Sequence, residues 1–507
     1  MTGLRGRVFA GPLLIFAALI LASLAAPAAF LGVATRLNTA ILDGFGRIFA
    51  YAAFAFVLTC AWAALSPLGR VRIGGAEATR LLSPWNWMAI TLTTTVAIGI
   101  LFWSTAEPVY HLAQPGGTGA EPGSPEAARF ALSTLYMHWS FTPYAIYTVP
   151  GLAFALAYHN LRLPFSLASP VRAATGRDMP RGARDGLDGL ALLALLFGLA
   201  ASLGAGILSL SGGLDRMAGT GTGPVTTLLV TLAVVGGFAA SSASGLQRGI
   251  RVLSDINTRV FIAVAVFVLV AGPTGRILAA GLDGLADYGR SFVSRSLLLP
   301  PHDEMGWAKA WTVFYWANWL AWAPLSAMFL GRIARGYTVR AYILVNLVLP
   351  ALFSIAWMTV FGGFALTVEA DAPGLLAGTL AEGGPERVLY AVLDQLPLNG
   401  LLVALIVALT YLSYVTAADS NTTVLAELSA THENMAPLDD EPRRTGLKIA
   451  YAAAVGGAAW SMVTLSGIDG VRMLSNLGGL PALFIVGGFN FCLIWMGTRG
   501  LAALREG

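Results

Sequence analysis

Residues 307–324 read WAKAWTVFYWANWLAWAP, and this stretch decides how the rest of the chain is interpreted. It opens an apolar segment, 308–331, that contains no acidic residue. About 20 such residues cross the ~30 Å hydrocarbon core of a bilayer, because each adds ~1.5 Å to a helix. Trp316, Trp319 and Trp322 recur at intervals of three, so they drift slowly around one helix face. A membrane-spanning helix with an aromatic face is predicted here.

The composition of the whole chain is typical of a membrane protein. Of its 507 residues, 56% are hydrophobic and 11% are charged, whereas soluble domains carry about 25% charged residues. The net charge is +4, but Lys and Arg form no sustained basic run, which disfavours nucleic-acid binding. Cys60 and Cys492 lie inside apolar runs, so neither a disulfide framework nor a metal motif is predicted.

Hydropathy predicts twelve membrane-spanning helices, at 12–34, 47–67, 86–105, 133–158, 187–211, 224–243, 258–282, 308–331, 341–367, 399–426, 447–467 and 474–497. The first apolar segment is longer than the core of a signal peptide, so we expect a retained helix. An even number of spans puts both termini on one side of the membrane. Arginines at 70–80, 162–184 and 332–340 share that side. The positive-inside rule therefore predicts cytoplasmic termini. The expected location is a bacterial-type inner (plasma) membrane.

Two segments predict interrupted spans. Many transporters repeat a helix bundle with inverted topology and bind their substrate where broken helices meet. The third span contains TTTVAIG at 93–99, and the eighth contains Pro324, which lacks a backbone N–H. We therefore expect two N-terminal peripheral helices, two five-helix repeats separated by a periplasmic connector, and a last helix with a short cytoplasmic tail. The expected bounds are 1–85, 86–282, 283–307, 308–467 and 468–507.

Aromatic side chains also mark the fourth span. The two groups are Trp139, Tyr144 and Tyr147 in the fourth span and Trp316, Trp319 and Trp322 in the eighth. Facing aromatic walls bind a quaternary ammonium group by cation–π attraction, worth about 2 kcal/mol when desolvated. The alternative is an interfacial belt of Trp and Tyr. Trp307 and Trp311 fit such a belt, whereas Trp319 and Trp322 are expected deeper.

The stretch FYWANWLAWAPLSAMFLGRIARG at 314–336 resembles the signature of the betaine/choline/carnitine transporter (BCCT) family. Further blocks follow in the family's order: AEP at 106–108, HW at 138–139, PGLA at 150–153, LGAG at 203–206, GI at 249–250, LSD at 253–255 and TAADS at 416–420. The resemblance covers almost the whole chain. It implies an all-α integral membrane protein with twelve transmembrane helices and an inverted five-helix repeat, the amino acid/sodium symporter-like fold. It also implies a central aromatic box for onium substrates.

Carried over by position, the family's aromatic box falls on Trp139, Tyr144, Tyr147, Trp319 and Trp322, and Trp316, Asn318 and Val96 complete the predicted substrate-binding set. Tyr144 and Asn318 stand where the family commonly has Trp. The Asn318 amide either recognises a substrate oxygen or bonds a neighbouring helix. Val96 lies where the family usually reads Gly-x-Gly-x-Gly, of which only Gly99 remains. This change either shifts the head-group preference or is a silent repacking.

Sodium is the coupling ion that the resemblance suggests, and no other cofactor or metal is expected. In sodium-coupled members, the third and tenth helices supply oxygen ligands. Thr93, Val96 and Thr416 occupy this region, while Ala417 lacks a hydroxyl. Sodium-independent exchangers of the family use an arginine in the region of Arg259 instead. The alternative for Arg259 is a positive-inside anchor.

The expected function is import of small onium compounds by alternating access. The expected substrates are glycine betaine, choline, carnitine or their sulfonium analogues. Coupling to a cation is the first expectation, and ion-independent exchange of onium metabolites is the alternative. An enzyme is not expected, because the spans carry no nucleophile triad or phosphate loop. Glu107-Pro108 is expected to end a helix, and His138 to be a packing residue. Expected partners are the substrate, membrane lipid and, by resemblance, further copies of this chain in a homotrimer.

Overall fold

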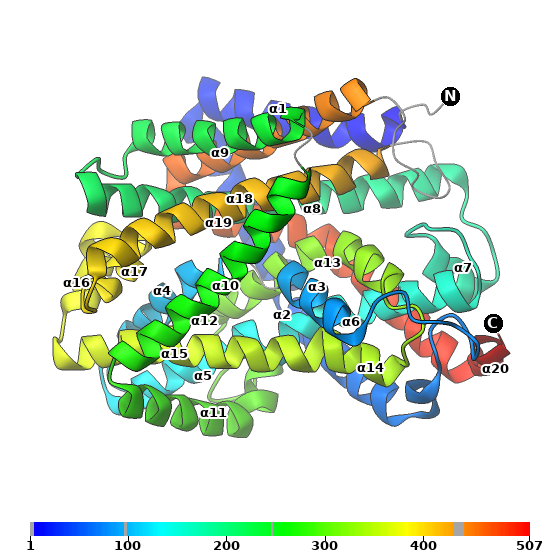
Figure 1. The fold of residues 1–507 in the computed structure, drawn as a ribbon, viewed down its shortest axis with the longest axis horizontal. Helices are drawn as coiled ribbons and strands as arrows, with labels where there is room; N and C mark the ends of the chain where they lie inside the picture. The colour runs from blue at the N-terminus through cyan, green and yellow to red at the C-terminus, as the bar shows by residue number, and fades with distance from the viewer. Residues whose placement is uncertain (1–4, 96–98, 245–246, 430–440, 507) are drawn as a thin grey trace.

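The computed structural model describes residues 5–95, 99–244, 247–429 and 441–506, and these residues fold almost entirely into helices (Figure 1). The helices are α1 Gly6–Ala25, α2 Pro27–Leu65, α3 Pro84–Thr95, α4 Ile100–Ala113, α5 Pro125–Trp139, α6 Phe141–Ala155, α7 Ser169–Thr175, α8 Arg181–Ala218, α9 Pro224–Ser244, α10 Gln247–Ala271, α11 Thr274–Ser296, α12 Met305–Ala308, α13 Phe314–Arg332, α14 Val339–Ile343, α15 Leu349–Asp371, α16 Leu375–Gly383, α17 Pro385–Leu393, α18 Asn399–Leu428, α19 Glu441–Arg499 and α20 Leu501–Glu506. Extended pairing within the described residues is limited to a bridge between Arg72 and Thr338. The predicted all-α class is confirmed.

Six helical segments of the described chain are long and apolar enough to cross a membrane on their own. They are Gly6–Ala25, Pro27–Leu65, Arg181–Ala218, Val339–Asp371, Asn399–Thr416 and Thr445–Arg499. The pair Arg259–Ala271 and Thr274–Ser296, bent by 106°, would add one more. In α19, Gly467 adopts φ 53° and ψ −131° and divides the 59 residues into two arms. A multi-pass membrane protein is therefore supported, although helix length alone does not yield twelve spans.

Several predicted spans are divided where the chain carries a local signal. The prediction of one helix over 12–34 is wrong, because α1 ends before Ala26 and Pro27 opens α2. The fourth predicted span divides at Ser140, whose φ of −118° and ψ of −117° separate α5 from α6. Pro143 falls in the first turn of α6, where its missing N–H costs no helical bond.

The two predicted interruptions have different outcomes. The predicted interruption of the third span falls on residues 96–98, which lie outside the described residues; α3 runs to Thr95 before them, and α4 begins at Ile100 after them. The predicted interruption at Pro324 is wrong, because α13 continues through that residue from Phe314 to Arg332. Proline removes one backbone bond, and a membrane helix tolerates this loss where neighbouring helices cover the freed carbonyl.

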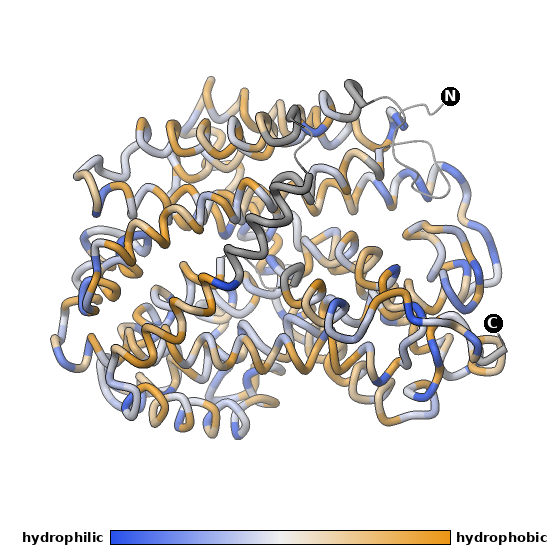
Figure 2. The backbone as a smooth tube through the Cα atoms, in the orientation of Figure 1, coloured by the Kyte–Doolittle hydropathy of each residue, from blue (hydrophilic) through white to orange (hydrophobic). Residues whose placement is uncertain are grey.

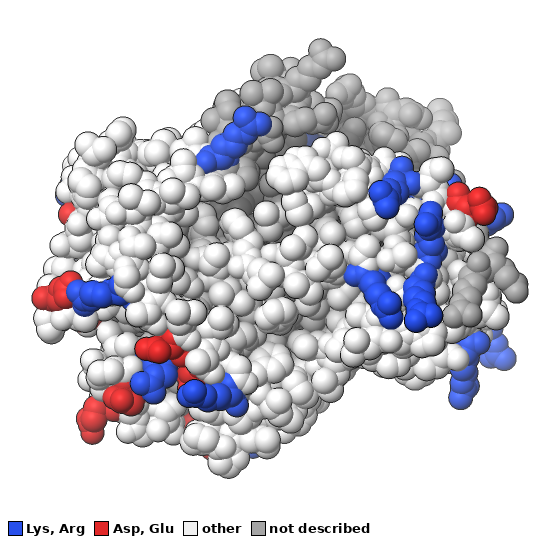
Figure 3. Space-filling model, turned by 60° about the horizontal axis from the view of Figure 1, so that its bottom comes forward, with Lys and Arg blue, Asp and Glu red and all other residues white. Residues whose placement is uncertain are grey.

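Charged side chains gather toward the two ends of the molecule, with a band of uncharged surface between them (Figure 3). Most helices are apolar along their length across this band (Figure 2). At one end, Lys and Arg predominate on the face that Figure 3 shows. At the opposite end, basic and acidic side chains lie close together (Figure 3). Exposed ion pairs of the described chain include Arg276 with Asp371 and Arg216 with Asp394, each at 2.7 Å. The uncharged band is the surface expected to face lipid.

The helix α13 lies in the interior and packs against α6, α8 and α19. On the neighbouring side, α4 packs against α5, and α5 leads through Ser140 into α6. This arrangement brings the aromatic residues of α13 against the last turn of α5 and the first turns of α6.

Candidate substrate-binding site

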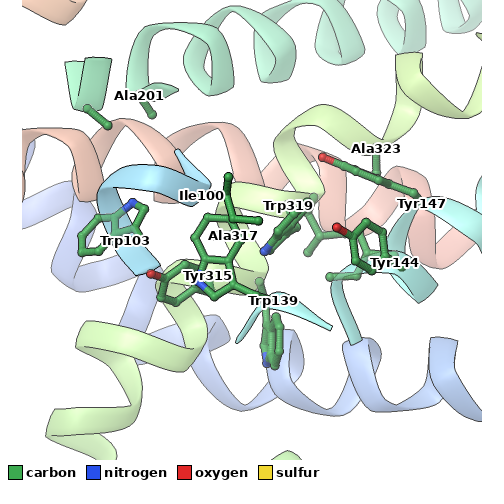
Figure 4. Close-up of a cluster of buried hydrophobic side chains, with 14 of the residues drawn as sticks. Ile100, Trp103, Trp139, Tyr144, Tyr147, Ala201, Tyr315, Ala317, Trp319 and Ala323 are labelled. Atoms are coloured by element: carbon green, nitrogen blue, oxygen red, sulfur yellow. The ribbon is translucent and has the colours of Figure 1, made fainter. Parts of the chain in front are cut away.

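A cluster of aromatic rings lies where α5, α6 and α13 meet (Figure 4). The ring centroid of Trp319 lies 5.5 Å from that of Trp139, 5.8 Å from Tyr144 and 5.5 Å from Tyr147. The interplanar angles of 80°, 58° and 68° correspond to tilted and edge-to-face packing, which aromatic quadrupoles favour. All four side chains are buried. The structure thus brings together four of the residues predicted from sequence, and this ring cluster is the candidate binding site.

The polar edges of three of the four rings are bonded to groups outside the ring cluster. The Trp319 indole donates from Nε1 to the carbonyl oxygen of His138 at 3.1 Å. The Trp139 indole donates from Nε1 to Glu107 Oε2 at 3.0 Å. The hydroxyls of Tyr144 and Ser354 share a hydrogen bond of 2.8 Å. These bonds fix the orientation of the rings and leave their faces as the apolar, electron-rich surfaces of the ring cluster.

Beside the ring cluster, Glu107 is the centre of a fully buried polar network. Its Oε1 accepts from His138 Nδ1 at 2.6 Å and from His111 Nε2 at 3.2 Å. Its Oε2 accepts from Trp139 and from the hydroxyl of Tyr315. Both histidines and Glu107 have no exposed surface. Since a carboxylate is an acceptor with about four lone-pair sites, the four donors satisfy it.

The expectation that Glu107-Pro108 ends a helix is wrong. The helix α4 runs through both residues to Ala113, with Pro108 inside it. Glu107 therefore lies mid-helix, with His111 one turn later on the same face. The four-residue spacing of Glu107 and His111 was the available sequence signal for this network, whereas Tyr315 was recognised only as part of the family signature. The expectation that His138 is a packing residue with satisfied hydrogen bonds agrees with its contacts to Glu107 and, at 3.0 Å, to Thr312.

These residues also offer donor atoms of the kinds that bind metal ions. One donor atom each from Glu107, His111 and His138 lie within 4.8 Å of one another. However, the Glu107 oxygens already have four hydrogen-bond partners, and two of these are the indole N–H of Trp139 and the hydroxyl of Tyr315. The arrangement is that of a hydrogen-bond network that joins α4, α5 and α13.

Three further predicted residues of α13 lie outside the ring cluster. Trp316 is buried and packs edge-on against His138, with ring centroids 5.8 Å apart. Trp322 lies against Gly198 of α8 and lines a small cavity with Tyr414. Asn318 Oδ1 accepts a hydrogen bond of 3.0 Å from Ser475 Oγ of α19. The last contact favours the interpretation of Asn318 as a residue that bonds a neighbouring helix.

The candidate ion-binding residues are placed only in part. Val96 and the side chain of Thr93 lie outside the described residues. Thr416 Oγ1 donates within its own helix, at 2.9 Å to Leu412 O and 3.0 Å to Ser413 O. Arg259 lies on α10 with an exposed side chain.

Trp311 does not form part of an exposed belt, contrary to expectation. Only 5% of its surface is exposed, and the guanidinium of Arg472 lies 4.4 Å from its ring centroid. Trp103 and Tyr110 of α4 flank the same guanidinium at 5.9 and 5.7 Å. This group forms a second aromatic surface between α4 and the arm of α19 that follows Gly467.

Long apolar helices and a ring cluster buried among the shorter helices define the class as a multi-pass membrane protein with an internal aromatic site. A family model described as "BCCT, betaine/carnitine/choline family transporter" matches residues 7–500. The chain belongs to this family and is a transporter, not an enzyme.

Named relatives cover most of the chain. Glycine betaine transporter 1 of Vibrio parahaemolyticus is 32% identical over 461 residues, which cover 88% of this chain and 84% of that protein. The glycine betaine transporter OpuD of Bacillus subtilis is 28% identical, covering 93% of this chain and 90% of its own length. The ectoine/hydroxyectoine transporter of Virgibacillus pantothenticus is 29% identical, with coverages of 91% and 90%.

Proposed function

We propose that this chain is a secondary active transporter that imports small onium compounds. Molecules like glycine betaine are the first substrates to test. The observation that carries the proposal is the ring cluster of Trp139, Tyr144, Tyr147 and Trp319, buried between three helices. A quaternary onium group has no N–H to donate, so aromatic faces are the groups that stabilise it. The names of the relatives, transporters of glycine betaine and of ectoines, support this substrate class.

Transport is proposed to follow alternating access in a fold of twelve spans, with inverted five-helix repeats at 86–282 and 308–467. The rings contact one another and are almost fully buried, so a head group reaches them only when helices move apart. The break at Ser140 lies beside the ring cluster and is suited to such movement. A four-helix bundle then rocks against the remaining scaffold to expose the site to each side in turn.

The proposed energy source is a sodium gradient, with Thr93, Val96 and Thr416 as candidate ligands. The ion drives import by binding more tightly to the substrate-loaded outward state. The second candidate is exchange of two onium metabolites without an ion, in which Arg259 takes the place of sodium.

The proposed location is a bacterial-type inner membrane, with both termini at the cytoplasmic side. The predominance of arginine at one end of the molecule supports this orientation (Figure 3). Membrane lipid is the proposed environment of the uncharged band, and a homotrimer is the proposed assembly.

Uptake of radiolabelled glycine betaine into proteoliposomes tests the proposal. The vesicles carry an imposed sodium gradient, a proton gradient, or unlabelled substrate inside and no gradient. Accumulation driven by sodium supports the symporter, and counterflow without any gradient supports the exchanger. Absence of saturable uptake for glycine betaine, choline, carnitine and sulfonium analogues alike would refute the proposed function.

A further inference from the structure

We propose that Glu107 is the positioning residue of the ring cluster: its carboxylate orients the Trp139 indole and strengthens the attraction of that ring for an onium group. This inference rests on the proposed function, because it concerns how the ring cluster binds its substrate. Glu107 itself touches no ring face; it acts through the indole N–H of Trp139, 3.0 Å away.

The place of Trp139 in the fold explains why its ring needs such a partner. Trp139 is the last residue of α5, and Ser140 leaves the helix at φ −118° and ψ −117°. A side chain in the middle of a helix is held between turns on both sides, whereas this one has a helical turn on one side only. Tyr315 and Trp319 pack against the ring with centroids 5.5 Å away, and the hydrogen bond to Glu107 of α4 holds its N–H edge.

The network extends the same control to the second tryptophan of the ring cluster. Glu107 Oε1 accepts from the His138 ring, and the backbone carbonyl of His138 accepts the indole N–H of Trp319. His138 and Trp139 are adjacent in sequence, so one carboxylate holds the end of α5 by two neighbouring side chains. Both indoles of the ring cluster are thereby set by the position of α4.

The charge of Glu107 matters as well as its shape. All four of its partners, His111, His138, Trp139 and Tyr315, offer N–H or O–H groups. An ionised carboxylate accepts all of them, whereas an amide of the same shape has one acceptor oxygen in place of two and carries no charge. Hydrogen bonds to a charged acceptor are the stronger ones and polarise their donors. A polarised indole N–H increases the electron density of the ring, which is the source of its attraction for a cation.

The test is a double-mutant cycle between Glu107 and Trp139. The dissociation constant of glycine betaine is measured by titration calorimetry for purified full-length wild type, Glu107→Gln, Trp139→Phe and the double variant. We expect Glu107→Gln to raise the constant about tenfold. The double variant should bind no more weakly than Trp139→Phe alone, because phenylalanine has no N–H for Glu107 to act on. A constant within twofold of wild type for Glu107→Gln, or strict additivity in the double variant, overturns the inference.

A matched control separates positioning from general destabilisation. Glu369 is another buried glutamate with satisfied oxygens, on α15 away from the ring cluster, and Glu369→Gln should leave the dissociation constant unchanged. If Glu107→Gln is not monodisperse, Glu107→Asp takes its place in the cycle. It keeps the charge on a shorter stem, so a smaller rise is expected that again disappears when Trp139 is phenylalanine. No rise with Glu107→Asp overturns the inference.

A measurement without ligand separates this inference from the proposed function. In protein labelled with ¹⁵N-tryptophan, the indole resonance of Trp139 is assigned as the one lost in Trp139→Phe. We expect this resonance to shift in Glu107→Gln, and an unchanged position overturns the positioning role. Failure of wild type to bind any onium compound refutes the proposed function, whereas normal wild-type binding that Glu107→Gln leaves intact refutes only the role of Glu107.

Discussion

Glu107 and Glu369 are both buried in the helical bundle, yet they are held in opposite ways. Glu369, near the end of α15, accepts backbone N–H groups from Gly374 at 2.7 Å, Leu376 at 2.6 Å and Ala377 at 3.3 Å. All three donors lie within eight residues of it. Glu107 instead accepts side chains from α4, α5 and α13, up to 208 residues away. The Glu369 carboxylate completes a local turn. The Glu107 carboxylate is fully hydrogen-bonded only when α4, α5 and α13 pack together.

The largest effect on binding is expected beside Glu107, at the centre of the ring cluster. Trp319→Ala removes the ring that contacts Trp139, Tyr144 and Tyr147, so the apparent substrate constant should rise by roughly tenfold or more. Substrate titration of the folded fraction measures this. Trp319→Phe is the control, because it keeps an aromatic face and should lose less affinity. Unchanged affinity in well-folded Trp319→Ala would remove the ring cluster from the binding site.

The opposite behaviour is expected at Glu369. Glu369→Ala leaves the turn between α15 and α16 without its acceptor, and the free energy of unfolding should fall by about 1–3 kcal/mol. The apparent substrate constant should stay within about twofold of the wild-type value. Glu369, unlike Glu107, stabilises a turn that does not contact the ring cluster. Thermal unfolding in detergent, followed by substrate titration, measures both quantities. A large loss of affinity with unchanged stability would contradict the distinction.

A smaller effect on affinity is expected at Trp322, which lies on α13 but outside the ring cluster. Its indole packs against Gly198 of α8 and lines a cavity with Tyr414. Trp322→Ala should change the dissociation constant of the substrate by less than about threefold, because this indole does not contact the ring cluster. Uptake should be slower, because the variant loses a packing contact between α13 and α8. Parallel measurements of binding and of transport rate in the same preparation separate these effects. A tenfold loss of affinity would extend the binding site to Trp322.

The smallest effect is expected at Asn318, on the face of α13 that meets α19. Asn318→Ala loses the bond to Ser475 and should lower stability by about 1 kcal/mol, with the order of preference among onium substrates unchanged. Competition uptake with choline, carnitine and glycine betaine gives that order. Asn318→Trp sharpens the test, because a changed head-group preference in this variant would place Asn318 on the substrate pathway.

Sequence reasoning succeeded where the signal was local or repeated. Apolar composition predicted the all-helical membrane class, and the family motifs predicted Trp139, Tyr144, Tyr147 and Trp319, which the structure brings together. It failed at Pro324, because a proline predicts a broken helix only when neighbouring helices do not cover the freed carbonyl. It also failed at Glu107, because α4 continues through Pro108, and a helix packed among others tolerates the lost backbone bond. His111 lies on the same helix, but the other three partners of Glu107 come from α5 and α13, so no window around α4 contains them.

The partners of Glu107 are separated from it by 4, 31, 32 and 208 residues, and this spacing has a consequence for biogenesis. The bond to His111 forms within α4 itself, and those to His138 and Trp139 follow once α5 has been synthesised. The hydrogen bond from Tyr315 can form only after α13 has entered the membrane. A nascent chain therefore carries an incompletely paired carboxylate through the insertion of every intervening helix, and the arrival of α13 completes its pairing.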